Sequence, residues 1–75
     1  MACRVGMSTN PDERIRHWKN QEGHTHSQIL ASGLTYEQAQ RTEDREARER
    51  GCRSSGGGQY VAGFVWSVYH VWGGR

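Results

Sequence analysis

The segment RVGMSTNPDERIRHW, residues 4–18, spans the change from an expected strand to an expected helix. Residues 3–6 form a short stretch compatible with a β-strand, and the polar turn residues after it end that strand. Asn10 is a favourable N-cap, and Pro11 suits the first position of a helix, where its missing N–H is not needed. This segment therefore predicts a strand followed by a helix over residues 11–20.

A second strand and a second helix are expected after a polar loop. Residues 26–31, HSQILA, are typical of a strand. Thr35 and Gln38 form a capping box, which predicts a helix over residues 36–50 that ends before Gly51. The expected helix also carries acid-first pairs at i,i+4 spacing, the favourable order for ion pairs: Glu37–Arg41, Asp44–Arg48 and Glu46–Arg50.

The C-terminal stretch FVWSVYHVW, residues 64–72, is the strongest strand signal in the chain. Both of its alternating faces are largely apolar, so we expect it either at the centre of a sheet or covered by a partner chain. The preceding residues 53–59, RSSGGGQ, are typical of a flexible loop. The order β-α-β-α-β predicts a single small α+β domain over residues 1–75, with a three-stranded sheet and two helices.

The composition limits the size of the core and the class of protein. With 75 residues, 33% hydrophobic residues and a mean hydropathy of −0.95, the chain forms one domain with a thin core. It contains no apolar run typical of a signal peptide or a membrane span. Its cysteines, Cys3 and Cys52, show no zinc-binding spacing. We therefore expect a cytoplasmic protein with reduced thiols and no membrane partner.

The net charge of +2 decides little, but the positive charges are unevenly distributed. The arginines of the second expected helix alternate with acids, which is typical of a solvated helix face. An earlier group of basic residues is the better candidate for contact with nucleic-acid phosphates. This early basic cluster consists of Arg4, Arg14, Arg16 and Lys19.

Glu43 is the most informative residue of the second expected helix. The stripe that faces the sheet should contain Tyr36, Ala39, Glu43 and Ala47, so that a carboxylate stands between two alanines. A buried carboxylate needs a cation, a hydrogen bond or a metal. Two interpretations stay open: Glu43 pairs with an arginine at the edge of the sheet, or it is a metal ligand.

Arg14 lies at the border of the expected buried face of the first helix, one turn before Trp18. An arginine at such a position is either a solvated flanking residue or a phosphate ligand. His17 follows Arg14 by three residues on the same face, so the two side chains form a candidate pair. The spacing alone leaves both interpretations of Arg14 open.

The order of these features over about residues 3 to 52 resembles the GIY-YIG nuclease domain. Val5-Gly6, the turn after it and Arg14 are similar to the family's strand ending in Tyr-Ile-Gly and to the helix that bears its catalytic arginine. The helix start at residues 34–39 and the spacing from Ala39 to Glu43 are similar to the helix that bears the family's metal-binding glutamate.

The chain departs from the family pattern in two places. Arg4 stands where the family has the tyrosine of Tyr-Ile-Gly. The family's first strand, which carries Gly-Ile-Tyr, does not precede Cys3. The resemblance implies that the last strand takes its place, as in a circular permutation, and that Tyr69 stands in for the first tyrosine.

The resemblance implies a metal-assisted hydrolysis of phosphodiester bonds. A divalent ion, Mg²⁺, on Glu43 would stabilise the leaving oxygen, and Arg14 would neutralise charge on the phosphate. Tyr69 would activate the attacking group. His17 is added to the catalytic candidates because it shares a helix face with Arg14. The catalytic candidates are therefore Arg14, His17 and Tyr69. The expected substrate is DNA.

Two other functions stay open beside the nuclease. The chain is then either a non-catalytic nucleic-acid-binding module on the same scaffold or a dimeric interaction protein. The apolar surface of the C-terminal strand favours a homodimer through that strand, because large apolar patches mark interfaces. A compact chain of this kind would suit a phage or a mobile element.

Overall fold

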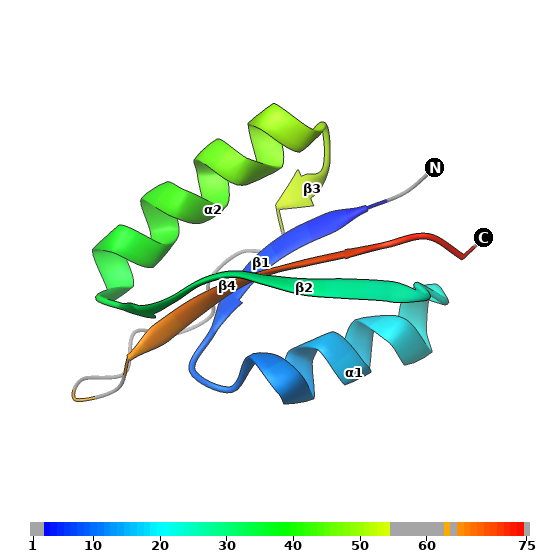
Figure 1. The fold of residues 1–75 in the computed structure, drawn as a ribbon, viewed down its shortest axis with the longest axis horizontal. Coiled ribbons are helices and arrows are strands. Elements are labelled where there is room, and N and C mark those ends of the chain that lie inside the picture. The colour runs from blue at the N-terminus through cyan, green and yellow to red at the C-terminus, as the bar shows by residue number, and fades with distance from the viewer. Residues whose placement is uncertain (1–2, 55–62, 64, 75) are drawn as a thin grey trace.

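The computed structural model describes residues 3–54, 63 and 65–74 of the chain (Figure 1). These residues form two helices and four strands in the order β1 (Arg4–Ser8), α1 (Pro11–Glu22), β2 (His26–Leu34), α2 (Tyr36–Arg50), β3 (Arg53–Ser54) and β4 (Trp66–Trp72). The predicted α+β class is confirmed. The predicted count of three strands is wrong, because β3 adds a fourth strand to the sheet.

The last strand, β4, lies inside a mixed sheet whose strand order is β2-β4-β1-β3. It runs antiparallel to both of its neighbours, β1 and β2, as expected for a strand with two apolar faces. Both edges of β4 are used within the chain, and its residues from Trp66 to Val71 are buried there. The apolar surface that favoured a homodimer through this strand is thus covered by the chain itself. On that side of the sheet, β2 is the edge strand.

The short strand β3 falls in the segment predicted as a flexible loop, residues 53–59. Arg53 and Ser54 pair in parallel with Arg4 and Val5 of β1. The backbone N–H of Arg53 also donates to the carbonyl oxygen of Cys3, at 3.1 Å. The loop prediction is therefore wrong for residues 53–54, because pairing with β1 imposes a strand that local sequence does not encode. Residues 55–59 lie outside the described part.

The ends of the helices follow the capping signals of the sequence. The Asn10 side chain accepts a hydrogen bond from the N–H of Glu13, as predicted, and α1 runs to Glu22, two residues past its expected end. Gly23 ends the helix in a left-handed conformation with φ of 72°. The capping box of α2 is present, and this helix has its predicted bounds.

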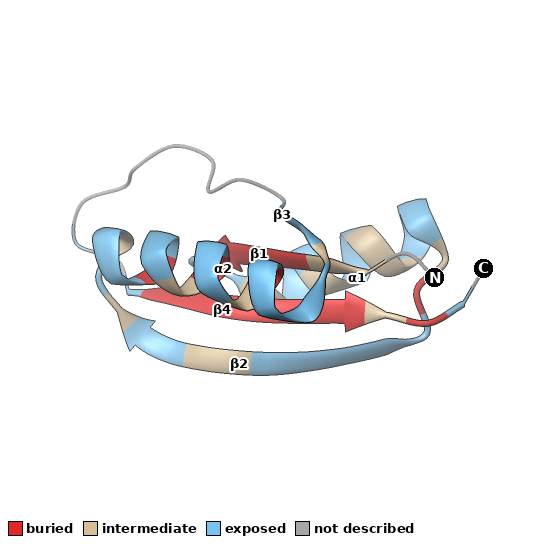
Figure 2. Ribbon diagram, turned by 90° about the horizontal axis from the view of Figure 1, so that it is seen from above, coloured by how far each residue is buried: buried red, intermediate tan, exposed pale blue. Residues whose placement is uncertain are grey.

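The two helices cover opposite faces of the sheet, with α2 above and α1 below it in Figure 1. Burial is concentrated in β1 and β4, whereas β2 is exposed along most of its length (Figure 2). Two alanines of α2, whose small side chains let the helix approach closely, complete a core made of Val5, Met7, Ala39, Ala47, Trp66 and Val68. Helix α1 buries none of its residues completely, so its face of the sheet is more thinly covered.

Candidate functional site

Tyr69 of β4 is the centre of the sheet face that α1 covers. Its side chain is fully buried, and its hydroxyl accepts a hydrogen bond from Nε1 of Trp18 in α1 at 2.8 Å. The ring lies over Gly6, its partner in the β1–β4 register. A Cβ atom at Gly6 would stand 2.3 Å from the Tyr69 hydroxyl oxygen, so only glycine leaves room for the ring. Residues 6, 18 and 69 thus form one packed unit.

Two arginines of the early basic cluster lie near the ring of Trp18. The guanidinium of Arg4 is 3.9 Å from the ring centroid, and that of Arg14 is 5.7 Å away. Arg4 also donates to the carboxylate of Glu22, and its side chain is only 14% exposed. The charge of Arg4 is therefore compensated within the fold, whereas Arg14 is exposed. The predicted partner of Arg14, His17, is also exposed and packs edge-on against Trp18.

The basic residues of α1 form fewer ion pairs than those of α2, where three of the four arginines are paired and Arg48 has no ion pair among the described residues. Among the described residues, no ion pair involves Arg14, Arg16 or Lys19. In α2, the ion pairs are Glu37–Arg41, Arg45–Glu46, Arg45–Glu49 and Glu46–Arg50. The uncompensated cations of the early cluster are thus Arg14, Arg16 and Lys19.

Glu43 points toward the sheet from α2, as its position in the helix predicts, and it is only 3% exposed. The hydroxyl of Ser54 donates to its Oε1 atom at 2.7 Å, so the hydrogen-bond partner is a serine and the first of the two interpretations, pairing with an arginine, is wrong. Its Oε2 atom is buried and has no partner among the described residues. Burial raises the pKa of the Glu43 carboxyl, and the hydrogen bond from Ser54 opposes this shift.

The sheet separates the predicted metal ligand from the predicted phosphate ligand. Glu43 is carried by α2 and Arg14 by α1, and the two helices lie on opposite faces (Figure 1). Mg²⁺ retains several water ligands and needs room for them beside its carboxylate. A single carboxylate that is almost fully buried and already bonded to Ser54 does not fit this requirement. The structure therefore does not assemble Arg14, Tyr69 and Glu43 into one site.

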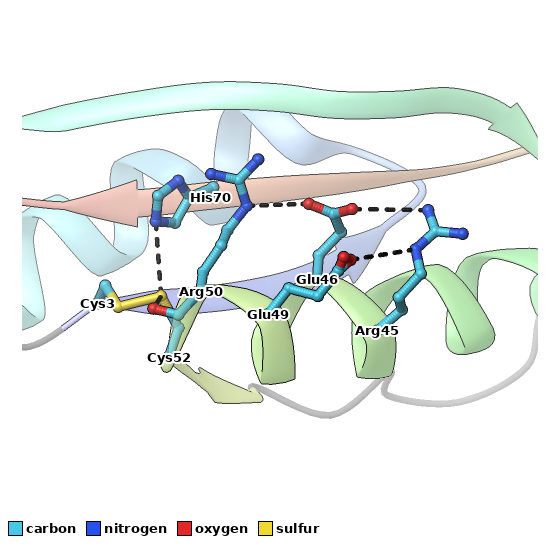
Figure 3. A network of polar contacts seen from close by, with 7 residues as sticks. All are labelled: Cys3, Arg45, Glu46, Glu49, Arg50, Cys52 and His70. Carbon is cyan, nitrogen blue, oxygen red and sulfur yellow. Dashed lines mark hydrogen bonds and ion pairs between the residues drawn. A yellow bond between two sulfur atoms is a disulfide. The ribbon is translucent and has the colours of Figure 1, made fainter.

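Cys3 and Cys52 form a disulfide in the structure, so the expectation of reduced thiols is wrong for this state. The pairing of β1 with β3 brings the two residues together, with 4.9 Å between their Cα atoms, although they are 49 positions apart. His70 of β4 directs Nε2 toward this pair, 3.6 Å from the sulfur of Cys52 (Figure 3). No local spacing in the sequence indicates this cysteine–histidine cluster, because its members come from three separate segments.

The surroundings of His70 are aromatic on one side and charged on the other. The ring of Trp72 stacks on the imidazole, with 4.4 Å between the ring centroids. Arg50 lies near it and is held by Glu46 through a hydrogen bond of 2.9 Å (Figure 3). Burial, followed by the charge of Arg50, lowers the pKa of His70, whereas the charge of Glu46 opposes this shift.

None of the protein families, curated proteins or solved structures compared with this chain matches it. Within the described part of the chain, neither helix combines the length and apolar character that a membrane crossing requires. The order of the elements and the strand pairing define a small α+β domain with a four-stranded mixed sheet.

Proposed function

We propose that this chain is a non-catalytic nucleic-acid-binding domain on a GIY-YIG-like scaffold, and that α1 contacts the phosphates. The observation that carries the proposal is the contrast between the helices. Among the described residues, three of the four arginines of α2 are neutralised by neighbouring acids, whereas Arg14, Arg16 and Lys19 of α1 have no ion pair. Cations without a local counter-charge gain most from a phosphate, because no existing ion pair is lost.

The packing under α1 supports the proposed relation to a permuted GIY-YIG domain. In that proposal the last strand replaces the family's first strand and lies beside the strand that ends in Gly6. The antiparallel pairing of β4 with β1, with Tyr69 opposite Gly6, is the arrangement that such a permutation requires. Trp18 anchors α1 over this pair through its hydrogen bond to Tyr69, so the exposed arginines of α1 are attached to the sheet at this point.

The same packing favours binding over hydrolysis. The Tyr69 hydroxyl is buried and already bonded to Trp18, so it does not reach a phosphate in this conformation. Glu43 lies across the sheet from Arg14 and does not provide a fitting Mg²⁺ site. We therefore assign no reaction step to Tyr69, His17 or Glu43.

The salt dependence of binding tests the proposal. Fluorescence anisotropy with labelled single-stranded and duplex DNA and RNA should show affinity that falls as salt rises, because each phosphate contact releases counterions. Replacing Arg14 and Arg16 together by alanine should reduce the slope of log K against log salt by about 1.4–1.8. The matched control replaces Arg41 and Arg45, which are ion-paired on α2, and should leave the slope unchanged. Equal slopes for both double variants would refute the interface.

A nicking assay separates binding from hydrolysis. Supercoiled DNA incubated with the wild type and Mg²⁺ or Mn²⁺ should remain uncut, with or without EDTA. Metal-dependent nicking that is lost in Glu43→Gln, while DNA binding survives, would contradict the non-catalytic assignment. That outcome would show that Glu43 reaches a metal in a conformation other than the one described here.

A further inference from the structure

The cysteine–histidine cluster, Cys3, Cys52 and His70, holds three metal-ligating side chains around one point. One donor atom of each residue lies within 4.8 Å of the other two. All three residues are at least partly buried, and His70 is only 8% exposed. Two thiolates and an imidazole are the donor set of zinc rather than of Mg²⁺, which prefers oxygen.

The distances in the cluster already approach those of a zinc site. Tetrahedral zinc, with Zn–S bonds of about 2.3 Å and Zn–N bonds of about 2.0 Å, separates its ligand atoms by roughly 3.5–3.8 Å. The sulfur of Cys52 and Nε2 of His70 are 3.6 Å apart, which fits this range. The two sulfurs must separate, and the sulfur of Cys3, which lies within 4.8 Å of the His70 nitrogen, must take up its own distance to the ion; breaking the bond between the sulfurs allows both movements.

The two cysteines are held in place by backbone hydrogen bonds that do not depend on the disulfide. The N–H of Cys52 donates to the carbonyl of Ala47 at the end of α2, at 2.8 Å. The carbonyl of Cys3 accepts from the N–H of Arg53, at 3.1 Å, where β3 pairs with β1. Reduction of the disulfide therefore leaves the backbone of both cysteines in place beside His70.

The imidazole of His70 lacks a strong partner in the disulfide state. Its Nδ1 atom is buried and has no hydrogen-bond partner among the described residues. Its Nε2 atom faces the sulfur of Cys52, and a disulfide sulfur has no proton to donate. A buried polar ring without a strong partner is costly, and a metal bound at Nε2 would supply that partner.

We propose that the reduced chain binds one Zn²⁺ ion through the sulfurs of Cys3 and Cys52 and Nε2 of His70. A dithiol reductant gives two electrons and two protons to the disulfide, which yields two thiols and leaves the reductant as its own disulfide. Zn²⁺ then replaces the two thiol protons. Three protein ligands leave the fourth position to water. The disulfide and the zinc site exclude each other, so the cluster is a redox-gated metal site.

Titration with Co²⁺, which takes the geometry of zinc and is visible by absorption, tests this proposal. The reduced wild type should bind one Co²⁺ per chain, with thiolate-to-cobalt charge transfer and the d–d bands of a tetrahedral ion. Zn²⁺ should displace the cobalt and raise the Tm of the reduced protein in proportion to the logarithm of its concentration. The oxidised protein should show none of these effects.

Variants identify the ligands. Cys3→Ser/Cys52→Ser should abolish the charge-transfer band, and His70→Asn should weaken binding by about tenfold or more. The matched control is His26→Gln, which removes an exposed histidine and should bind as the wild type does. The fold of His70→Asn is first checked in its oxidised form. If that form is unfolded, X-ray absorption at the zinc edge of the reduced wild type counts the sulfur and imidazole ligands directly.

Three results would overturn the proposal. The first is equal binding of metal by the oxidised and the reduced wild type. The second is equal binding by the reduced wild type and a folded His70→Asn variant, or a zinc-edge spectrum without an imidazole ligand. The third is a stoichiometry of one metal per two chains, which would place the thiolates of different molecules on one ion.

Discussion

Replacing Gly6 by alanine should strongly destabilise the protein, although alanine ordinarily suits a strand better than glycine. The new Cβ would lie 2.3 Å from the Tyr69 hydroxyl oxygen and 2.5 Å from its Cζ atom. Tyr69 is fully buried, and it cannot move aside without breaking its hydrogen bond with Trp18. The added methyl group must therefore be accommodated by moving β1, β4 or α1.

The magnitude follows from two contributions. Overpacking a buried site costs about 1–3 kcal/mol, and loss of the Trp18–Tyr69 hydrogen bond costs about 1 kcal/mol more. The sum of about 2–4 kcal/mol is a large share of the roughly 4–11 kcal/mol expected for a domain of this length. At about 4–8 °C per kcal/mol, the Tm should fall by at least about 8 °C.

Urea unfolding of the oxidised protein, followed by circular dichroism and tryptophan fluorescence, measures this cost. The control repeats Gly6→Ala in a Tyr69→Leu background, where the ring atoms that meet the Cβ are absent. There the same substitution should be neutral or stabilising by about 0.5 kcal/mol. An equal cost in both backgrounds, or a cost below about 1 kcal/mol in the wild type, would refute the close packing of residues 6 and 69.

Three further predictions concern stability and topology. The metal-free variant Cys3→Ser/Cys52→Ser should lose about 4 kcal/mol relative to the oxidised wild type, because the disulfide closes a loop across 49 positions; equal urea midpoints would contradict this. Burial raises the folded-state pKa of Glu43 above the usual 4.5, so the stability from its protonated form is present below pH 4.5 and is lost as the pH rises through the folded-state pKa. Glu43→Gln should flatten that decline, and parallel urea midpoint profiles for variant and wild type between about pH 4 and pH 8 would argue against it. A circular permutant that places residues 65–74 ahead of residue 3 through a short linker should fold and form the disulfide, since Arg4 and Val71 are paired across β1 and β4; an unfolded circular dichroism spectrum would count against this topology.

Local signals in the sequence were sufficient to predict the two helices and the inward orientation of Glu43. The capping box at Thr35 fixes where α2 begins, and Gly51 fixes where it ends, because both act through nearby backbone groups. Ala39, Glu43 and Ala47 follow each other at i,i+4 spacing and so share one face of α2, which places the carboxylate against the sheet. These features depend on contacts within one or two helical turns.

Features that depend on distant segments were missed or only partly predicted. The strand β3 exists because two residues pair with β1, and the disulfide exists because that pairing aligns Cys3 with Cys52. The side of the sheet on which each helix packs is also set by the tertiary fold. The resemblance to the GIY-YIG family therefore implied one site for Arg14 and Glu43, although the sheet lies between the helices that carry them.

The placement of β4 has a consequence for how the chain acquires its structure during synthesis. β1 and β2 do not pair with each other, since each pairs with β4, which follows both of them along the chain. A nascent chain without residues 66–72 therefore has two strands with no common partner and leaves Val5 and Met7 uncovered by β4. We expect truncated chains to stay unfolded and to be open to proteases, because the long-range pairing comes last. The sheet is thus assembled only once the residues of β4 are available to pair with both β1 and β2.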